Sequence, residues 1–273
     1  MTQPHLPLLV EADVLQTHLG EKRLLIVDLG KADLYARGHI PGAVFLDYNR
    51  IIHSEKPLGG LLPDEGQLSE VLSALGLTPQ THVVAYDDEG GGKAARLLWT
   101  LEALGHRHYS LLNGGLHAWA NEGHPLNQEQ EQHPASHYQA KLCEECEAVT
   151  DRAFILEHLD DPEVALLDVR SPAEYRGDKR YAARGGHIPG AVHIEWTEMM
   201  EQSHNLRLKA IAELRNLLEE KGITPDKTVV AYCQTHHRSA HTWFVLKYLG
   251  YTARGYVGSW SDWGNQPDTP IEG

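Results

Sequence analysis

The stretch "GHIPGAV" occurs twice, letter for letter, at residues 38–44 and 186–192. Three other blocks also occur in both halves of the chain, in the same order: an aspartate closing an apolar run (Asp28, Asp168), "VVAY" (83–86, 229–232) and a tryptophan-bearing block (114–119, 258–263). The two copies lie 140 residues apart for the aspartates, 148 for "GHIPGAV", 146 for "VVAY" and 144 for the tryptophan blocks. Four blocks at a nearly constant offset predict two copies of one domain.

The copies are expected to occupy residues 1–127 and 148–273, with a linker over 128–147 between them. The polar run "NQEQEQHPASHYQAK", which carries a proline, has the composition of a linker. The second copy has eight extra residues between its aspartate and its "GHIPGAV" block (148 − 140 = 8), within "YRGDKRYAARG". This insertion predicts a basic loop in the second copy alone.

Within each copy, short apolar runs alternate with amphipathic ones. Thr150 is predicted to cap the first helix of the second copy, and Gly222 to end its longest helix. The alternation predicts an α/β fold in which each copy is a mostly parallel sheet flanked by helices. In the second copy we expect strands near 164–169, 191–194, 227–232 and 254–257, and helices near 151–158, 207–221, 239–249 and 259–264.

The composition excludes some partners. With 24 basic and 38 acidic side chains, the formal charge is 24 − 38 = −14, which disfavours nucleic acid as a partner because phosphate is repelled. No apolar stretch approaches the roughly 18 residues that span a bilayer, so we expect no membrane association. The first residues lack a basic segment of the secretory type, so a cytoplasmic location is expected. An anionic substrate would have to be attracted by local groups.

The three cysteines are Cys143, Cys146 and Cys233. A small odd number argues against a disulfide framework and favours a reducing compartment. Cys143 and Cys146 form a C-x-x-C pair with no further zinc ligands at suitable spacing, so they are expected to be two thiols in the linker. No metal and no organic cofactor are expected.

Cys233 lies in "YCQTHHRS" (232–239), between an apolar strand and a helix. Ligands of parallel sheets gather beyond the carboxyl ends of the strands, and Cys233 is the first residue past such an end. A short loop there would turn backbone N–H groups inward above a helix N-terminus, with Arg238 close by. Such surroundings lower a thiol pKa from roughly 8.5 to between about 3.5 and 7.5. The pattern predicts a nucleophile, and the alternative is a buried core cysteine.

The matching place in the first copy favours the nucleophile. There the sequence reads "YDDEGGGKAARLLWTL", with Asp87, Asp88 and Glu89 at the tip. A core cysteine has no reason to be replaced by aspartates, whereas a reactive tip can be lost from one copy. The first copy is therefore predicted to be catalytically silent, with a tip that would not hold an anion. His236 and His237 are interpreted as polar donors at the loop rim, and a Cys-His relay is the weaker alternative.

Together these motifs resemble the rhodanese family, and the resemblance to tandem-domain rhodaneses runs from about residue 8 to residue 272. The loop "CQTHHRS" is similar to that of bacterial thiosulfate sulfurtransferases, and "GSWSDWGNQPDTPIE" resembles the family's C-terminal signature. The resemblance implies that Cys233 takes the outer sulfur of thiosulfate, releases sulfite and becomes a persulfide, from which cyanide or another thiophile collects the sulfur. It also implies substrate-binding roles for the loop residues Gln234, Thr235, His236, His237, Arg238 and Ser239.

The chain departs from mammalian rhodanese at two positions. Thr235 and Glu174 stand where basic residues help to bind thiosulfate there. Arg238 and four basic residues of the inserted loop are the candidates to substitute for them: Arg176, Lys179, Arg180 and Arg184.

Three other functions are alternatives for this sequence. A persulfide carrier that delivers sulfur to a protein acceptor would use the same chemistry at Cys233, so it stays open. A 3-mercaptopyruvate sulfurtransferase fits less well, because that loop has small residues after the cysteine. Cysteine phosphatases need C-x5-R, and the spacing from Cys233 to Arg238 is C-x4-R, a smaller ring that suits one sulfur better than a phosphoryl group.

Overall fold

The computed structural model describes residues 6–144 and 146–273. The chain forms two compact units, each of which includes a short segment from the other half of the sequence. Unit 1 consists of Met1–Ile51, Pro63–Cys146 and Glu201–Leu208, and unit 2 consists of Ile52–Leu62, Glu147–Met200 and Lys209–Gly273.

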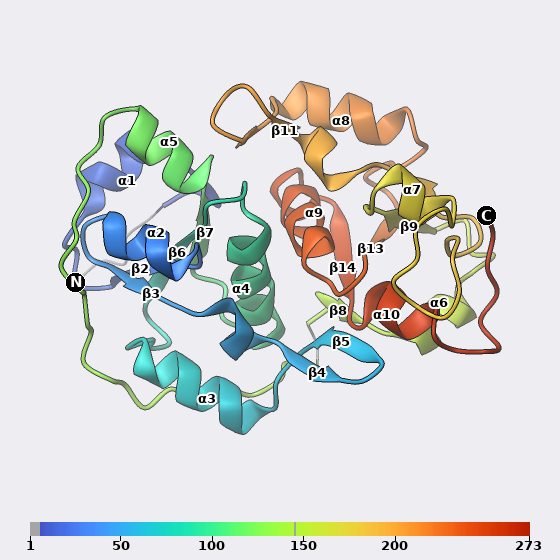
Figure 1. Cartoon of the computed structure of the whole chain (residues 1–273), viewed down its shortest axis with the longest axis horizontal. Coiled ribbons are helices and arrows are strands. Elements are labelled where there is room, and N and C mark those ends of the chain that lie inside the picture. The colour runs from blue at the N-terminus through green and yellow to red at the C-terminus, as the bar shows by residue number, and fades with distance from the viewer. Residues whose placement is uncertain (1–5, 145) are drawn as a thin grey trace. The chain divides into compact units, whose positions relative to one another are not determined.

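Unit 1 is built on a five-stranded sheet of order β1-β7-β6-β2-β3, in which every pairing is parallel. Its strands are β1 (Leu9–Val10), β2 (Leu24–Asp28), β3 (Ala43–Phe45), β6 (His82–Tyr86) and β7 (Tyr109–Leu112). Its helices are α1 (Ala12–His18), α2 (Ala32–Arg37), α3 (Glu65–Ala74), α4 (Gly92–Ala103) and α5 (Gly115–Asn121), with a 3-10 turn at Tyr48–Ile51 (Figure 1).

Unit 2 is built on a parallel sheet of order β10-β9-β13-β14-β8. Its strands are β8 (Val149–Thr150), β9 (Val164–Asp168), β10 (Val192–His193), β13 (Thr228–Tyr232) and β14 (Thr252–Tyr256). Its helices are α6 (Arg152–Glu157), α7 (Pro172–Tyr175), α8 (Ile211–Glu219), α9 (Arg238–Tyr248) and α10 (Ser259–Trp263), with a 3-10 turn at Trp196–Met199. Two further pairs complete the chain: β4 (His53–Glu55) with β5 (Leu58–Leu61), and β11 (Met200–Glu201) with β12 (Arg207–Leu208).

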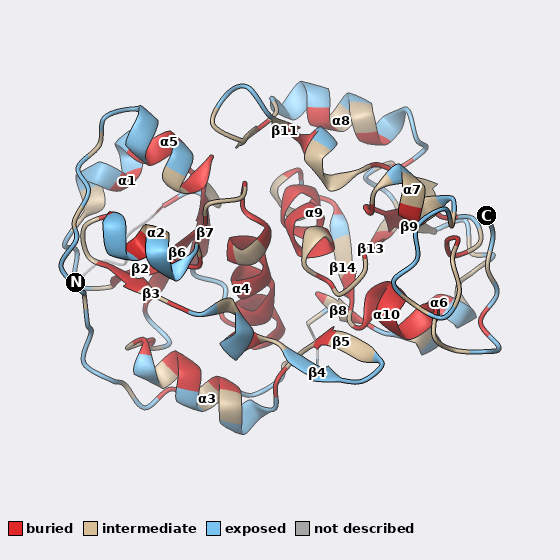
Figure 2. Ribbon diagram, in the orientation of Figure 1, coloured by how far each residue is buried: buried red, intermediate tan, exposed pale blue. Residues whose placement is uncertain are grey.

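The two sheets have the same strand order, so the predicted repeat of one α/β domain is confirmed. Even the register repeats, because Asp28 pairs with Tyr86 in unit 1 and Asp168 pairs with Tyr232 in unit 2. The helix that follows the central strand, α4 or α9, is buried over most of its length (Figure 2).

The repeated "GHIPGAV" block fixes a backbone turn against the central strand. In unit 2 the Ile188 N–H donates to the Tyr232 hydroxyl over 3.1 Å, and the His187 ring stacks on Tyr175 at 3.7 Å between centroids. In unit 1 the same block behaves in the same way, with Ile40 donating to Tyr86 over 3.2 Å. A buried tyrosine needs a hydrogen-bond partner for its hydroxyl, and the "GHIPGAV" block supplies one. This explains why the block and the strand that ends in the tyrosine occur together in both halves.

Two predicted element boundaries were wrong. Thr150 does not cap α6, because it ends strand β8, and the cap is Asp151, whose carboxylate accepts from the Phe154 N–H over 2.9 Å. The helix expected over 207–221 begins only at Ile211, because Arg207–Leu208 pairs as a strand with β11.

The expectation of two thiols at Cys143 and Cys146 was also wrong. The two residues form a disulfide, with Cα atoms 5.3 Å apart, a separation that a disulfide spans. The chain turns tightly here, because the Cys146 N–H donates to the Cys143 carbonyl over 3.2 Å. The remaining cysteine, Cys233, is free.

Candidate active site

Cys233 lies between the end of β13 and the start of α9, as predicted. Its side chain is buried, with 1% of the residue exposed. Two backbone bonds hold this loop to the start of α10: the Trp260 N–H donates to the Cys233 carbonyl and the Ser261 N–H donates to the Gln234 carbonyl, each over 2.9 Å. The loop is therefore supported by the tryptophan-bearing block that recurs in both halves of the chain.

The surroundings of the Cys233 sulfur favour the thiolate. Burial raises the pKa, but the positive charge of Arg238 and hydrogen bonds from the Ser239 hydroxyl, the Ser239 N–H and the Thr235 N–H lower it, to about 7 overall. The Ser239 hydroxyl lies 3.4 Å from the sulfur. About half of the thiol is therefore ionised at neutral pH, and the backbone donors form the cradle that the short loop predicts.

Arg238 is held by Glu174, the acidic residue that departs from mammalian rhodanese. The two form a bidentate ion pair, with both N–O distances 2.8 Å. Burial raises the pKa of Glu174, but hydrogen bonds from Arg238 and Ser171 lower it to about 2, so this carboxylate is ionised at neutral pH. Ser171 and Glu174 also close the capping box of α7. The carboxylate therefore orients the guanidinium whose charge acts on the sulfur.

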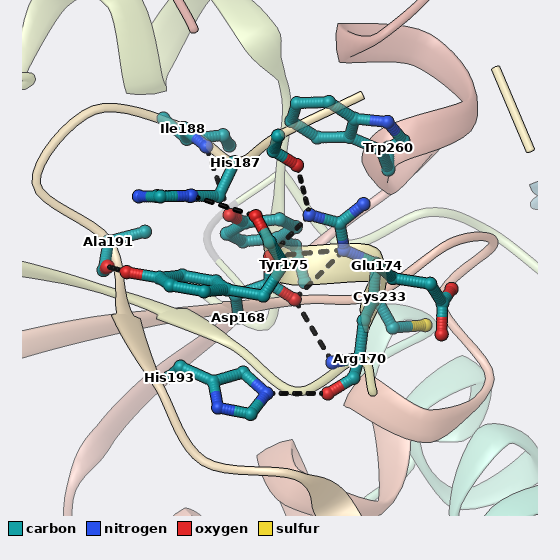
Figure 3. A network of polar contacts seen from close by, with 12 residues as sticks. Asp168, Arg170, Glu174, Tyr175, His187, Ile188, Ala191, His193, Cys233 and Trp260 are labelled. Atoms are coloured by element: carbon teal, nitrogen blue, oxygen red, sulfur yellow. Dashed lines mark hydrogen bonds and ion pairs between the residues drawn. The ribbon is translucent and has the colours of Figure 1, made fainter. Parts of the chain in front are cut away.

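A buried ion pair supports the end of the neighbouring strand (Figure 3). Asp168, the last residue of β9, accepts from the Arg170 guanidinium over 2.6 Å, and that guanidinium lies over the Trp260 ring at 4.3 Å. Both charged side chains are almost fully buried. In unit 1 the residue that matches Arg170 is Gly30, and without an arginine there burial raises the pKa of Asp28 to about 6. Sequence reasoning missed Arg170, although "LLDVR" places a charged residue directly after a buried run.

Three of the predicted substrate-binding residues, Gln234, Thr235 and Arg238, line a pocket of about 700 Å³. The pocket presents three basic side chains and one carboxylate, and the carboxylate is the one already paired with Arg238. The lining residues are Ser54, Lys56, Pro57, Leu58, Gly59, Ser171, Glu174, Lys179, Tyr181, Gln234, Thr235, Arg238 and Ser261. All of them belong to unit 2.

The other three predicted loop residues lie outside the lining. His236 and Ser239 are fully buried. The interpretation of His236 as a polar donor at the loop rim was therefore wrong. The His236 Nδ1 lies 2.8 Å from the Ser239 hydroxyl, which itself points at the Cys233 sulfur. His237 precedes α9 as its N-cap, and its ring centroid lies 6.0 Å from that of Trp196.

Of the four basic residues in the inserted loop, only Lys179 lines the pocket. Arg176 pairs with Asp178 at 3.0 Å. Arg184 donates to the Thr269 carbonyl over 2.8 Å and so anchors the C-terminal tail. Arg180 is exposed and outside the lining. The insertion therefore supplies one positive charge to the pocket rather than four.

The matching loop in unit 1 contains a carboxylate where unit 2 has its thiol. Asp87 is fully buried and accepts four backbone hydrogen bonds, from Glu89 (3.0 Å), Gly91 (2.8 Å), Lys93 (2.9 Å) and Ala94 (3.0 Å). The cradle is therefore present in unit 1 but is filled by the chain's own carboxyl group, whose pKa is raised by burial. This gives a physical reason for the prediction that the acidic tip would not hold an anion.

Within residues 6–144 and 146–273, no group of three or more histidine, cysteine, aspartate or glutamate side chains is arranged to hold a metal ion.

Residues 11–122 and 152–266 match the Rhodanese-like domain, so the chain belongs to the rhodanese family, with one domain in each half. This confirms the resemblance to tandem-domain rhodaneses. The chain is 47% identical over 268 residues to the thiosulfate sulfurtransferase of Azotobacter vinelandii (98% of this chain, 97% of the relative). It is 45% identical to that of Pseudomonas aeruginosa, with the same coverage.

The chain is also similar to a sulfur carrier protein and to a solved structure. The sulfur carrier protein TtuD of Thermus thermophilus is 37% identical over 288 residues, covering 99% of this chain and 98% of the relative. The wild-type structure of EanB matches with a TM-score of 0.87 at 24% identity, covering 97% of this chain and 69% of that one. At that identity the second match shows a shared fold alone.

Proposed function

We propose that this protein is an enzyme, a thiosulfate sulfurtransferase that moves sulfane sulfur from thiosulfate to a thiophilic acceptor such as cyanide through a persulfide on Cys233. The observation that carries the proposal is a free thiol with a pKa of about 7, facing two backbone N–H donors at the end of a parallel strand. The two thiosulfate sulfurtransferases at 47% and 45% identity support it.

The reaction divides into two displacements at sulfur. The Cys233 thiolate attacks the outer sulfur of thiosulfate, the sulfur–sulfur bond of thiosulfate breaks, and sulfite leaves with the electron pair. The resulting persulfide is anionic at its terminal sulfur, where the Thr235 and Ser239 N–H groups and the Arg238 charge stabilise it. Cyanide then attacks the terminal sulfur, thiocyanate forms, and the thiolate is regenerated. A covalent intermediate between two substrates predicts ping-pong kinetics.

The roles of the loop residues follow from their positions. Gln234, Thr235 and Arg238 line the pocket and would contact the incoming anion, since Cys233 itself is almost fully buried beneath them. The buried residues His236 and Ser239 would hold the thiolate, because His236 bonds to the Ser239 hydroxyl that points at the Cys233 sulfur. His237, the N-cap of α9, would act through its position at the start of that helix.

The division of labour along the chain also stays a proposal. Residues 148–273 would carry catalysis, 128–147 would act as a linker, and 1–127 would be a catalytically silent domain. The carboxylate of Asp87, which fills the cradle of the first domain, supports this assignment.

The steady-state assay that tests the proposal follows thiocyanate formation from thiosulfate and cyanide. Initial rates at several concentrations of both substrates should give parallel lines in double-reciprocal plots, and Cys233→Ser should abolish turnover. A Cys143→Ser/Cys146→Ser variant is the matched control, because it removes the other two cysteines and should leave turnover intact. Turnover by Cys233→Ser would refute the proposal.

The sulfur-carrier alternative is favoured by one observation, the 37% identity to a sulfur carrier protein over nearly the whole chain. In that case the acceptor would be a thiol of another protein, which attacks the terminal sulfur of the persulfide, rather than cyanide. Loading the protein with labelled thiosulfate and offering it a candidate acceptor protein separates the two functions. Substituting 3-mercaptopyruvate for thiosulfate in the same assay tests the third candidate donor.

The cytoplasmic location is a prediction that cell fractionation tests. In the described part of the chain, the helices are all too short or too polar to cross a membrane. The net charge of −14 supports the prediction that nucleic acid is not a partner.

A further inference from the structure

The β4–β5 hairpin brings part of the first sequence half into the catalytic unit. Residues 52–62 belong to unit 2 although they precede most of the first domain in sequence. The Ser261 hydroxyl accepts from the Gly59 N–H over 3.0 Å, which ties the hairpin to α10. Five hairpin residues, from Ser54 to Gly59, line the pocket beside the catalytic loop.

Gly60 shows how closely the hairpin approaches the catalytic loop. A Cβ atom built on Gly60 would lie 1.9 Å from the Thr235 carbonyl oxygen, and the residue has a φ of +70°. Only glycine accommodates this contact, because any side chain would collide with the backbone of the loop. The hairpin is therefore held at a fixed place beside Cys233 rather than resting loosely against it.

Lys56 lies near the tip of this hairpin and lines the pocket while remaining exposed. Across the described residues, its ammonium group makes no ion pair, so its charge is available to a ligand. Lys179 likewise makes no ion pair within the described residues, and its ammonium group instead contacts Tyr181, with the ring centroid at 5.0 Å. By contrast, the Arg238 charge is matched by Glu174. The two lysines are thus the uncompensated charges of the pocket.

Thiosulfate is a dianion, and it must approach a thiolate inside a protein of net charge −14. Both the whole-protein field and the nucleophile repel it, so binding needs local positive charge at the pocket. Two residues of the pocket lining, Glu174 and Thr235, bring no positive charge. The positive charge has to come from elsewhere on the pocket wall.

We propose that Lys56 is a substrate-binding residue that recognises the sulfonate end of thiosulfate at the pocket edge, with Lys179 as its partner from the inserted loop. This inference rests on the proposed function, because it names the anion that the sulfur-transfer site takes. The sulfonate end would sit between the two ammonium groups, with the outer sulfur directed toward Cys233. The sequence half without a nucleophile thereby contributes a specificity-determining side chain to the catalytic site.

The test compares Lys56→Met with Lys221→Met, an exposed lysine of unit 2 outside the pocket lining. At low ionic strength Lys56→Met should raise the KM for thiosulfate about fivefold with little change in kcat, since an exposed charge acts on binding through a high dielectric. Lys56→Arg should restore most of the affinity, and Lys221→Met should match the parent. Added salt should weaken thiosulfate binding by the parent more than by Lys56→Met, because salt screens the Lys56 charge that only the parent carries.

A binding measurement separates this inference from the proposed function. In the Cys233→Ser background, where no sulfur transfer occurs, calorimetry should detect thiosulfate binding that weakens about fivefold when Lys56→Met is added. Thiosulfate binding and turnover that are unaffected by Lys56→Met would overturn the role of Lys56 while leaving the sulfurtransferase intact. A parent protein that neither binds nor turns over thiosulfate would overturn both.

Discussion

The charge of Arg238 is the largest of the influences that lower the pKa of Cys233, and this can be tested directly. Arg238→Gln alone would leave the Glu174 carboxylate buried without its partner, which destabilises a protein by roughly 3–5 kcal/mol. The informative perturbation is therefore the double variant Arg238→Gln/Glu174→Gln, which removes both charges and keeps polar groups at both positions. Glu174→Gln alone is the matched control, because it retains the arginine charge.

The expected size of the effect follows from the pKa. The parent thiol has a pKa of about 7 and is about half ionised at pH 7. Without the arginine charge, burial should return the pKa to roughly 8.5 or above, a change of about 2 kcal/mol. The thiolate fraction at pH 7 then falls to about 3%, so sulfur loading from thiosulfate should slow about 15-fold. The deficit should shrink as the pH rises from 7 toward the new pKa and should nearly vanish above it. Glu174→Gln should keep the pKa at or below about 7.

The assay records the ultraviolet absorbance of the thiolate against pH, with Cys233→Ser as the blank, and the loading rate with thiosulfate over the same range. Because the folded pKa of this acid is depressed, the midpoint of ionisation in the parent should lie near pH 7, below the roughly 8.5 of a free thiol. A double variant whose thiol still titrates near pH 7 would show that the backbone donors and Ser239 suffice, and the role given to Arg238 would be refuted.

Two further predictions concern parts of the site that do not react. Asp87→Asn should destabilise unit 1 by about 2–4 kcal/mol in urea unfolding, because an amide turns one acceptor into a donor that faces N–H groups. Unchanged stability would contradict the assignment of Asp87 as the acceptor that fills its cradle. Gly60→Ala should lower kcat/KM for thiosulfate at least tenfold, because the added Cβ displaces the Thr235 backbone. The control is Gly20→Ala, at a positive-φ glycine with open space around it, which should leave turnover unchanged. Equal kinetics for the two variants would show that the hairpin does not shape the loop.

The sequence predicted those features that depend on neighbouring residues. The strand before Cys233 and the helix after it were located within one residue of their ends, because apolar runs and helical periodicity are local signals. The parallel sheets followed from the alternation of elements. The repeat predicted a catalytically silent first copy, because the same blocks occur there without the nucleophile. The disulfide was missed because the C-x-x-C spacing of Cys143 and Cys146 does not distinguish a disulfide from two free thiols.

What the sequence could not predict are contacts between distant residues. Gly59 and Ser261 are 202 positions apart, and no periodicity indicates that this hairpin belongs to the catalytic unit. Glu174 and Arg238, which form an ion pair, are 64 positions apart in the sequence. Glu174 therefore does not merely remove positive charge from the pocket, because its carboxylate orients the Arg238 guanidinium. Lys56 could not be recognised as a pocket residue for the same reason.

The central claim is that Cys233, and no other residue, carries the transferred sulfur. Intact-protein mass spectrometry after incubation with thiosulfate and removal of the excess measures this directly. The account predicts that the parent and the Cys143→Ser/Cys146→Ser variant each gain the mass of one sulfur atom, which cyanide then removes, and that Cys233→Ser gains none. A sulfur adduct on Cys233→Ser, or its absence from the parent under conditions of turnover, would contradict the account.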